Sequence, residues 1–167
     1  DAIGLYQLHR PDPDVDYADS LGAMRELYDA GKVRMVGISN ATLDQIEQAR
    51  QVVGEALVSV QNQFSPRFRS SADELRYCDE HGLAFLPWSP LGGIGNAAEL
   101  GSSYAAFAEL AEDRGVSPQQ VCLAWLLAQG RHVVPIPGSS RPETVTDSAR
   151  AGELRLTEEE LSRLDAA

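Results

Sequence analysis

The feature that most constrains this chain is an alternation of short apolar runs with longer segments of helical periodicity. The runs are rich in Val, Ile and Leu, and they cover residues 3–8, 33–38, 57–60, 83–87 and 133–136. Most show little alternation between apolar and polar residues, which is typical of strands covered on both faces of a parallel sheet. The order of strands and helices therefore predicts an all-parallel α/β fold built from right-handed crossovers.

Helix starts are marked by Ser or Thr followed three positions later by Glu or Gln, the pattern of a capping box. Five such pairs precede segments of helical periodicity: Thr42/Gln45, Ser71/Glu74, Ser117/Gln120, Ser140/Glu143 and Thr157/Glu160. The residue after Ser117 is Pro118, which suits a first helical position because no amide donor is needed there. These pairs predict where the helices between the strands begin.

Polar residues follow the carboxyl end of every apolar run: His9, Ser39-Asn40, Gln61-Asn62, Trp88-Ser89 and Gly138-Ser139. In a (β/α)8 TIM barrel these ends converge on one mouth, whereas in an open sheet they spread along an edge. No Gly-x-Gly-x-x-Gly fingerprint follows any run, which also favours the barrel over a doubly wound sheet. A complete barrel takes eight strands and roughly 250 residues. The sequence therefore predicts a single partial barrel domain over residues 1–167, with an upstream piece absent before Asp1.

Charge and cysteine content narrow the possible partners. The formal net charge is −11 without a basic cluster, so we expect neither nucleic acid nor a membrane surface as a partner. Cys78 and Cys122 lie in separate helical segments, which favours reduced thiols in a cytoplasmic protein. The cysteines lack ligand spacing and the three histidines are far apart in sequence, so no metal site is predicted.

Five segments resemble the aldo-keto reductase family and occur in that family's order, from its fourth strand to its eighth. They are LYQLHRPD (5–12), GISN (37–40), SVQNQFS (59–65), PWSPLG (87–92) and PIPGSSRPE (135–143). The likeness covers essentially the whole chain. It implies strands 4–8 of the barrel and NADPH-dependent reduction of aldehydes or ketones, small carbonyl substrates, by hydride transfer. It also implies NADP(H) as the cofactor in preference to NAD(H).

His9 is the one catalytic residue that the resemblance assigns to this chain. Taken alone, a histidine at a strand end is more often hydrogen-bonded to backbone. In the family, the histidine at this position hydrogen-bonds the substrate carbonyl. A neutral imidazole donor there polarises the carbonyl for attack by hydride.

Four residues match the family's nicotinamide-binding positions: Ser39, Asn40, Gln61 and Trp88. The first three supply donors and acceptors for a carboxamide without adding charge, although Ser-Asn alone would indicate no more than a turn. The resemblance places Trp88 against the nicotinamide ring, where a planar side chain fixes one face of the cofactor. A tryptophan packed in the core is the alternative, but the flanking prolines place Trp88 at a rim.

Two loops and one helix match the family's phosphate and adenosine positions. Ser89, Leu91 and Gly93 fall in the pyrophosphate loop, where small residues let backbone amides approach phosphate oxygens. Gly138, Ser139 and Arg141 precede a helix N-terminus and match the loop that holds the 2′-phosphate. The family's Glu-Asn pair on that helix reads Asp147-Ser148, and a basic residue carried by some members is replaced by Thr144.

The family's catalytic tyrosine, lysine and aspartate lie upstream of the histidine strand, so the resemblance implies that this chain lacks them. Its only lysine is Lys32, expected at the opposite end of the barrel from the mouth. We therefore expect the fragment alone to be inactive and to need the missing N-terminal half. A non-catalytic, redox-sensing module that binds a nicotinamide nucleotide is the alternative, and a structural half-barrel that binds nothing is a third. A short loop over residues 94–103 predicts an open substrate pocket.

Overall fold

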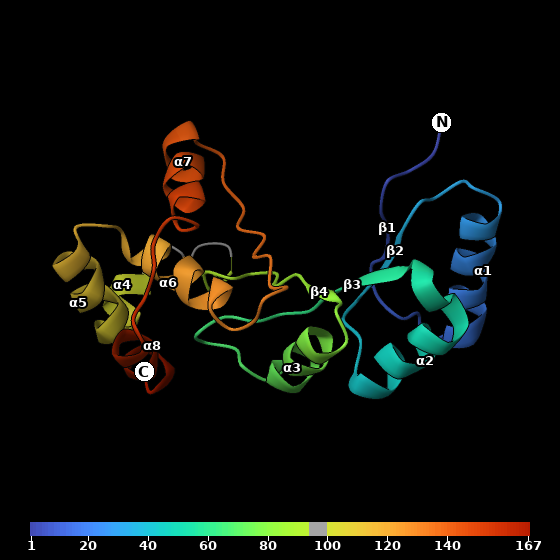
Figure 1. Ribbon diagram of the computed structural model, residues 1–167, viewed down its shortest axis with the longest axis horizontal. Coiled ribbons are helices and arrows are strands. Elements are labelled where there is room, and N and C mark those ends of the chain that lie inside the picture. Colours follow the sequence, from blue (N-terminus) through green and yellow to red (C-terminus); the bar gives the residue numbers. More distant parts are fainter. Residues whose placement is uncertain (94–99) are drawn as a thin grey trace. The chain divides into compact units, whose positions relative to one another are not determined.

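The computed structural model describes residues 1–93 and 100–167 and divides the chain into two compact units. The first unit contains Asp1–Asn62 and Ser71–Leu86, and the second contains Gln63–Ser70 and Pro87–Ala167. The strands and helices α1 to α3 belong to the first unit, and helices α4 to α8 belong to the second (Figure 1). The loop expected over residues 94–103 falls mainly on 94–99, outside the described residues.

Four of the five apolar runs form a parallel sheet in the first unit. Its strands are hydrogen-bonded in the order β1 (Tyr6–Leu8), β2 (Val36–Ser39), β3 (Leu57–Gln61) and β4 (Ala84–Phe85). Three strands are shorter than the runs that predicted them, and Ile3 and Val33 form only an isolated bridge. Val36, Ile38 and Val60 are fully buried, as expected for strands that are covered on both faces.

Helices α1 (Tyr17–Asp29), α2 (Leu43–Val53) and α3 (Ala72–Glu80) form the crossovers between these strands, and the short 3-10 helix η1 (Gly54–Ala56) leads into β3. Each α-helix buries apolar side chains in the core of the unit. The predicted capping box at α2 is confirmed, because Thr42 and Gln45 exchange hydrogen bonds. Ser71 precedes α3 as predicted, but its side chain makes no capping hydrogen bond.

The second unit is built around one buried helix. Its helices are α4 (Leu100–Ser103), α5 (Ala105–Arg114), α6 (Pro118–Leu127), α7 (Pro142–Arg150) and α8 (Glu158–Asp165). Trp125 of α6 is 1% exposed and stacks on Phe64, with ring centroids 5.9 Å apart. Its indole N–H donates to the Asp165 carboxylate at 2.7 Å. The Arg69 guanidinium lies over the same indole, 5.0 Å from the ring centroid, which ties residues 63–70 to this unit.

The fifth predicted strand is not a strand in the structure. In residues 133–136, Val133 takes part in an isolated bridge and the rest carry no regular secondary structure. Pro135 and Pro137 have no amide hydrogen to donate, so a continuous ladder cannot form there. The amide of Ile136 still donates to the carbonyl of Pro87 at 3.3 Å, which keeps this extended segment beside the residues after β4.

Two further features bear on the expectations from sequence. Both cysteines are free and fully buried; burial raises the pKa of Cys78 to about 12 and raises that of Cys122 too, so neither thiol ionises at neutral pH. In the described part of the chain, no helix has the length and apolarity that a membrane span requires.

Candidate functional site

Four of the residues predicted from sequence gather where β1, β2 and β3 end. We call His9, Ser39, Asn40 and Gln61 the strand-end cluster. Ser39 pairs with Gln61 in the sheet register. The Ser39 side chain is only 2% exposed, and its hydroxyl donates to the Gln61 carbonyl at 2.6 Å. The backbone amide of Asn40 donates to the same carbonyl at 3.1 Å, so the ends of β2 and β3 are held together.

Asn40 connects the cluster to β1. Its φ of 56° lies in the left-handed region, which Asn tolerates better than most residues. In this conformation its Nδ2 donates to the His9 carbonyl at 2.9 Å and to the Ser39 hydroxyl at 3.1 Å. One side chain therefore joins the ends of two adjacent strands. The parallel topology explains why residues far apart in sequence meet at this edge.

The His9 imidazole is exposed and makes no hydrogen bond to the residues described here. The backbone-bonded alternative considered from sequence is therefore not the arrangement in the structure. Asn62, one residue beyond β3, is buried and serves a different purpose. It accepts from the Ala41 amide at 3.1 Å and donates to the Ala41 carbonyl at 2.8 Å, which fixes the backbone beside Asn40.

Trp88 lies at the start of a turn in the second unit. It is half-buried and forms an isolated parallel bridge with Gln63, so it is less enclosed than Trp125. Ser89 has a φ of 51°, and its carbonyl accepts from the Gly92 amide at 2.9 Å to close the turn. Gly93 follows with a φ of 101°.

The turn around residues 89–93 depends on glycine. A side chain at Gly92 or Gly93 would be strained by their positive φ, whereas glycine adopts it freely. Among the described residues, an added Cβ at Gly93 would find only the Ser89 hydroxyl within 4 Å, at 3.9 Å. Leu91, the remaining residue predicted in this loop, is half-buried. The turn thus combines small residues with a half-buried backbone, and the phosphate contact predicted for it stays a prediction.

The loop before α7, residues 138–141, is exposed and locally hydrogen-bonded. Ser139 Oγ accepts from the Arg141 amide at 3.3 Å and also contacts the Thr144 hydroxyl. Thr144 in turn donates to the Arg141 carbonyl at 2.9 Å. Arg141, not Ser140, is the N-cap of α7, so the cap predicted at Ser140 is wrong; Pro142 fixes the first helical position one residue later.

Asp147 is held by α6 in the structure. Its Oδ2 accepts from the Ser117 hydroxyl and its Oδ1 from the Gln120 side-chain amide, each at 2.6 Å. Ser117 also caps α6 by accepting from the Gln120 backbone amide at 3.0 Å, as its sequence pattern predicted. The carboxylate therefore joins α7 to the start of α6, and the cofactor contact predicted for Asp147 stays a prediction.

Comparison with known proteins decides the family. The sequence model of the aldo/keto reductase family matches residues 1–167. The chain belongs to the aldo/keto reductase family. It is 35% identical over 163 residues to an uncharacterized oxidoreductase, C215.11c, of Schizosaccharomyces pombe, covering 98% of this chain and 51% of that protein. It is 34% identical over 146 residues to pyridoxine 4-dehydrogenase of Escherichia coli, covering 87% of this chain and 49% of the relative.

Solved structures agree with this assignment. The thermostable aldo-keto reductase Tm1743, solved with the inhibitor epalrestat, is 30% identical with a TM-score of 0.86, covering 99% of this chain and 60% of the other. An aldo-keto reductase from Klebsiella pneumoniae in complex with NADPH is 28% identical with a TM-score of 0.87, covering 99% and 58%. The parallel α/β fold thus matches that of this oxidoreductase family, and the NADP(H) expected from sequence agrees with the cofactor in the Klebsiella protein. The chain spans about half the length of the curated relatives it matches.

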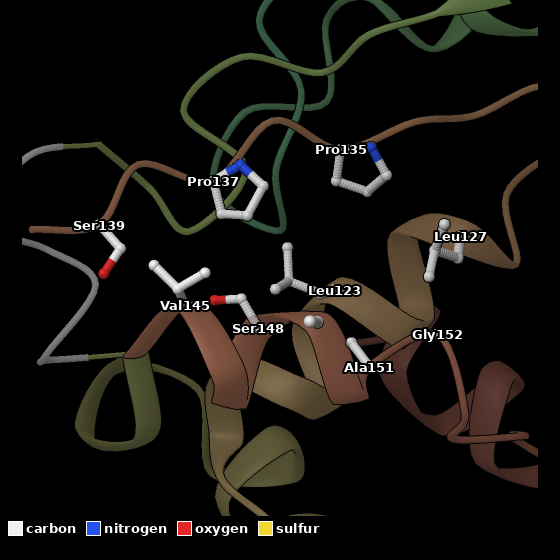
Figure 2. A pocket seen from close by; sticks show the side chains of 10 residues that line it. Leu123, Leu127, Pro135, Pro137, Ser139, Val145, Ser148, Ala151 and Gly152 are labelled. Atoms are coloured by element: carbon white, nitrogen blue, oxygen red, sulfur yellow. The ribbon is translucent and has the colours of Figure 1, made fainter. Parts of the chain in front are cut away.

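One pocket of this aldo-keto reductase chain was not predicted from sequence. It has a volume of about 430 Å³ and lies in the second unit between α6, α7 and the extended segment after α6 (Figure 2). Leu123, Pro135 and Val145 give it an apolar lining, and Ser139 and Ser148 supply hydroxyls. Of the predicted cofactor residues only Ser139 lines it. Apolar and small residues recur at helical spacing on α7, and this pattern in the sequence indicates the face of the helix that lines the pocket.

Proposed function

We propose that this chain is the cofactor-binding part of an NADP(H)-dependent aldo-keto reductase that reduces aldehydes or ketones by hydride transfer. The observation that carries the proposal is the strand-end cluster. The side chains of Ser39 and Asn40 are held by hydrogen bonds at the edge where three parallel strands end, which is where (β/α) barrels build active sites. The proposal includes that β1 to β4, with the extended segment 133–136, correspond to strands 4–8 of the barrel, and that the protein is cytoplasmic.

The strand-end cluster suits the carboxamide of a nicotinamide. Asn40 is exposed, and because its Nδ2 already donates to His9 and Ser39, its part in binding would be to accept through Oδ1. The half-buried Gln61 side chain has both a donor and an acceptor. The Ser39 hydroxyl is committed to the Gln61 carbonyl and is buried. We therefore assign carboxamide binding to Asn40 and Gln61, and we assign Ser39 the task of holding both in place.

The second unit suits the phosphates. The turn at 89–93 offers backbone and small residues, and the start of α7 offers free amides together with the positive end of a helix dipole. Arg141 is exposed, and among the described residues its guanidinium makes no ion pair. A guanidinium at that position distinguishes a 2′-phosphate from a hydroxyl, which is the basis for proposing NADP(H) over NAD(H).

Bound nicotinamide would supply the hydride, and His9 would orient the substrate carbonyl. The proton must come from a group acidic enough to donate near neutral pH. Tyr17 does not qualify, because burial raises its pKa to about 12. Lys32 precedes β2, at the end of the sheet opposite Ser39. We propose that no described tyrosine or lysine replaces the family's pair and that this chain alone is inactive.

The N-terminal half is proposed to complete both the barrel and the catalytic set. The relatives are about twice as long as this chain. In the described sheet β1 pairs on one side only, and Tyr6 at its start is 43% exposed, while Ile3 and Leu5 just before it are 52% and 37% exposed. An unpaired strand with exposed apolar residues tends to add another strand. A preceding barrel strand would cover this edge.

The test is turnover by the full-length protein, measured as NADPH oxidation against a panel of aldehydes and ketones. We expect turnover in the wild type, and loss of turnover with retained NADPH binding in His9→Ala. NADPH binding without turnover across the panel would instead support the non-catalytic nucleotide-binding module. Neither binding nor turnover would leave the purely structural half-barrel.

Cofactor selectivity is tested separately with Arg141→Met. Losing one charge-assisted contact to the 2′-phosphate should weaken NADPH binding by about tenfold and leave NADH binding unchanged. An exposed arginine elsewhere, Arg131→Met, serves as the control for a general loss of positive charge. Equal weakening of NADPH and NADH binding would contradict the role given to Arg141.

A further inference from the structure

A second polar layer lies in the sheet directly beneath the strand-end cluster. Gln7, Gly37 and Ser59 are register neighbours on β1, β2 and β3. Each stands two residues before a member of the cluster, and residues two apart on a strand point to the same face. The two layers therefore share one face of the first unit's sheet.

Gly37 has a steric reason to be glycine. It is not among the residues with positive φ, so its backbone conformation does not require glycine, and glycine weakens a strand interior. A Cβ added at Gly37 would lie 1.9 Å from Gln7 Oε1 and 2.4 Å from Ser59 Oγ. The Gln7 side chain thus occupies the space over Gly37 and reaches towards Ser59. Any larger residue at position 37 would displace it.

The two oxygens that meet over Gly37 are buried without a partner. Neither Gln7 Oε1 nor Ser59 Oγ makes a hydrogen bond in the structure, and Ser59 is 1% exposed. A buried acceptor without a donor carries a large desolvation penalty, so such groups in folded proteins usually have one. Because the two oxygens lie 1.9 Å and 2.4 Å from one point, they are at most about 4.3 Å apart, so one small donor beside them could bond to both.

We propose that Gln7 and Ser59 hold one buried water molecule over Gly37. A water can donate one hydrogen to Gln7 Oε1, and with Ser59 it can either donate to Oγ or accept from the hydroxyl. Buried waters occupy polar sites with two to four partners, whereas apolar cavities stay dry. A metal cation would need more oxygen ligands than these two. The water site consists of first-unit residues only and needs no cofactor. Its test is therefore independent of the test of the proposed function.

A crystal structure of the full-length protein at high resolution tests the site directly. We expect a solvent peak about 2.7–3.2 Å from both Gln7 Oε1 and Ser59 Oγ. Three results would overturn the proposal. They are an empty space, a side chain from another part of the protein in its place, and a reversed Gln7 amide whose Nε2 donates directly to Ser59.

Thermal unfolding gives an independent test with Gln7→Met, Ser59→Ala and the double variant. If a water joins the two side chains, each single change should lower Tm by about 2–4 °C, because it leaves the other group short of a partner. The double variant should then lose less than the two singles together. Ser71→Ala is the matched control, because Ser71 makes no capping hydrogen bond. Unchanged or raised Tm in the single variants would mean that neither oxygen is bonded to a water, which would contradict the proposal.

Discussion

The strand-end cluster of the first unit and the α7 segment of the second unit are proposed to bind two parts of the same cofactor, yet they are built differently. In the cluster, buried Ser39 and left-handed Asn40 are fixed by hydrogen bonds to backbone carbonyls of neighbouring strands. Helix α7 buries none of its own residues, and side-chain contacts such as those of Asp147 hold it to α6. The contrast indicates a preorganised site for the nicotinamide and a more adaptable one for the phosphates.

The largest effect is expected at Gly37, where an added Cβ would overlap the Gln7 and Ser59 side chains. Gly37→Ala should destabilise the full-length protein by about 2–3 kcal/mol, because the new Cβ would force both the Gln7 side-chain amide and the buried Ser59 hydroxyl to move. The measurement is the free energy of unfolding in urea. Gly22→Ala in α1 is the control: nothing lies within 4 Å of its added Cβ, so stability should rise by about 0.5–1 kcal/mol. A tolerated Gly37→Ala would mean that this layer of the sheet is not close-packed.

The next largest loss of stability is expected from substitutions of Asn40. Asn40→Ala removes the hydrogen bonds to His9 and Ser39 and puts a poor residue in the left-handed region, for a cost of about 2 kcal/mol. Asn40→Gly keeps the backbone relaxed, so it should cost about half as much. Urea unfolding and NADPH titration of both variants separate the two contributions. Equal stability of the two variants would show that backbone strain plays no part.

In the second unit, Asp147→Ala should cost about 1 kcal/mol, because it breaks the hydrogen bonds from Ser117 and Gln120. Glu143→Ala, an exposed residue in the first turn of the same helix, should be nearly neutral and serves as the control. NADPH affinity measured on both variants decides whether Asp147 also contacts the cofactor. A loss of affinity without a loss of stability would assign it to the cofactor and not to the α6–α7 contact.

The smallest effect concerns acid stability. The hydrogen-bonded guanidinium of Arg114 lowers the pKa of Glu160 from 4.5 to about 2. A lowered carboxyl pKa stabilises the folded state above pH 4.5, and this contribution is lost as pH falls towards 2. Glu160→Gln should therefore lower Tm at pH 7 by about 1–2 °C. On acidification, the Tm of this variant should fall less than that of the wild type. The same Tm–pH curve in Glu160→Gln and in the wild type would contradict the role given to the Arg114–Glu160 pair.

The sequence predicted the sheet and its polar edge because both depend on local patterns. Runs of branched apolar residues predicted four parallel strands, and parallel strands end at a common edge, which is why His9, Asn40 and Gln61 meet. The fifth strand was wrong for a reason visible in the sequence, since Pro135 and Pro137 remove its donors. The convergence of all the strand ends on one mouth stays a prediction.

Other features depend on contacts that no local pattern encodes. The positive φ of Asn40 follows from its hydrogen bonds to neighbouring strand ends. The fit of Gln7 over Gly37 depends on the register of two strands whose residues are thirty positions apart. Asp147 finds its partners in another helix. In each case the residue type was visible in the sequence, but the neighbour that determines its role was not.

The order in which the chain supplies its two units has a practical consequence. Residues 63–70 belong to the second unit, residues 71–86 belong to the first unit again, and all residues from 87 onward belong to the second. A single protease cut or gene split therefore cannot release two self-sufficient pieces. A cut after residue 62 would deprive the first piece of α3 and β4, and a cut after 86 would leave the second piece without the segment that stacks on Trp125. Engineers who wish to recombine this protein with a relative should exchange the two units together.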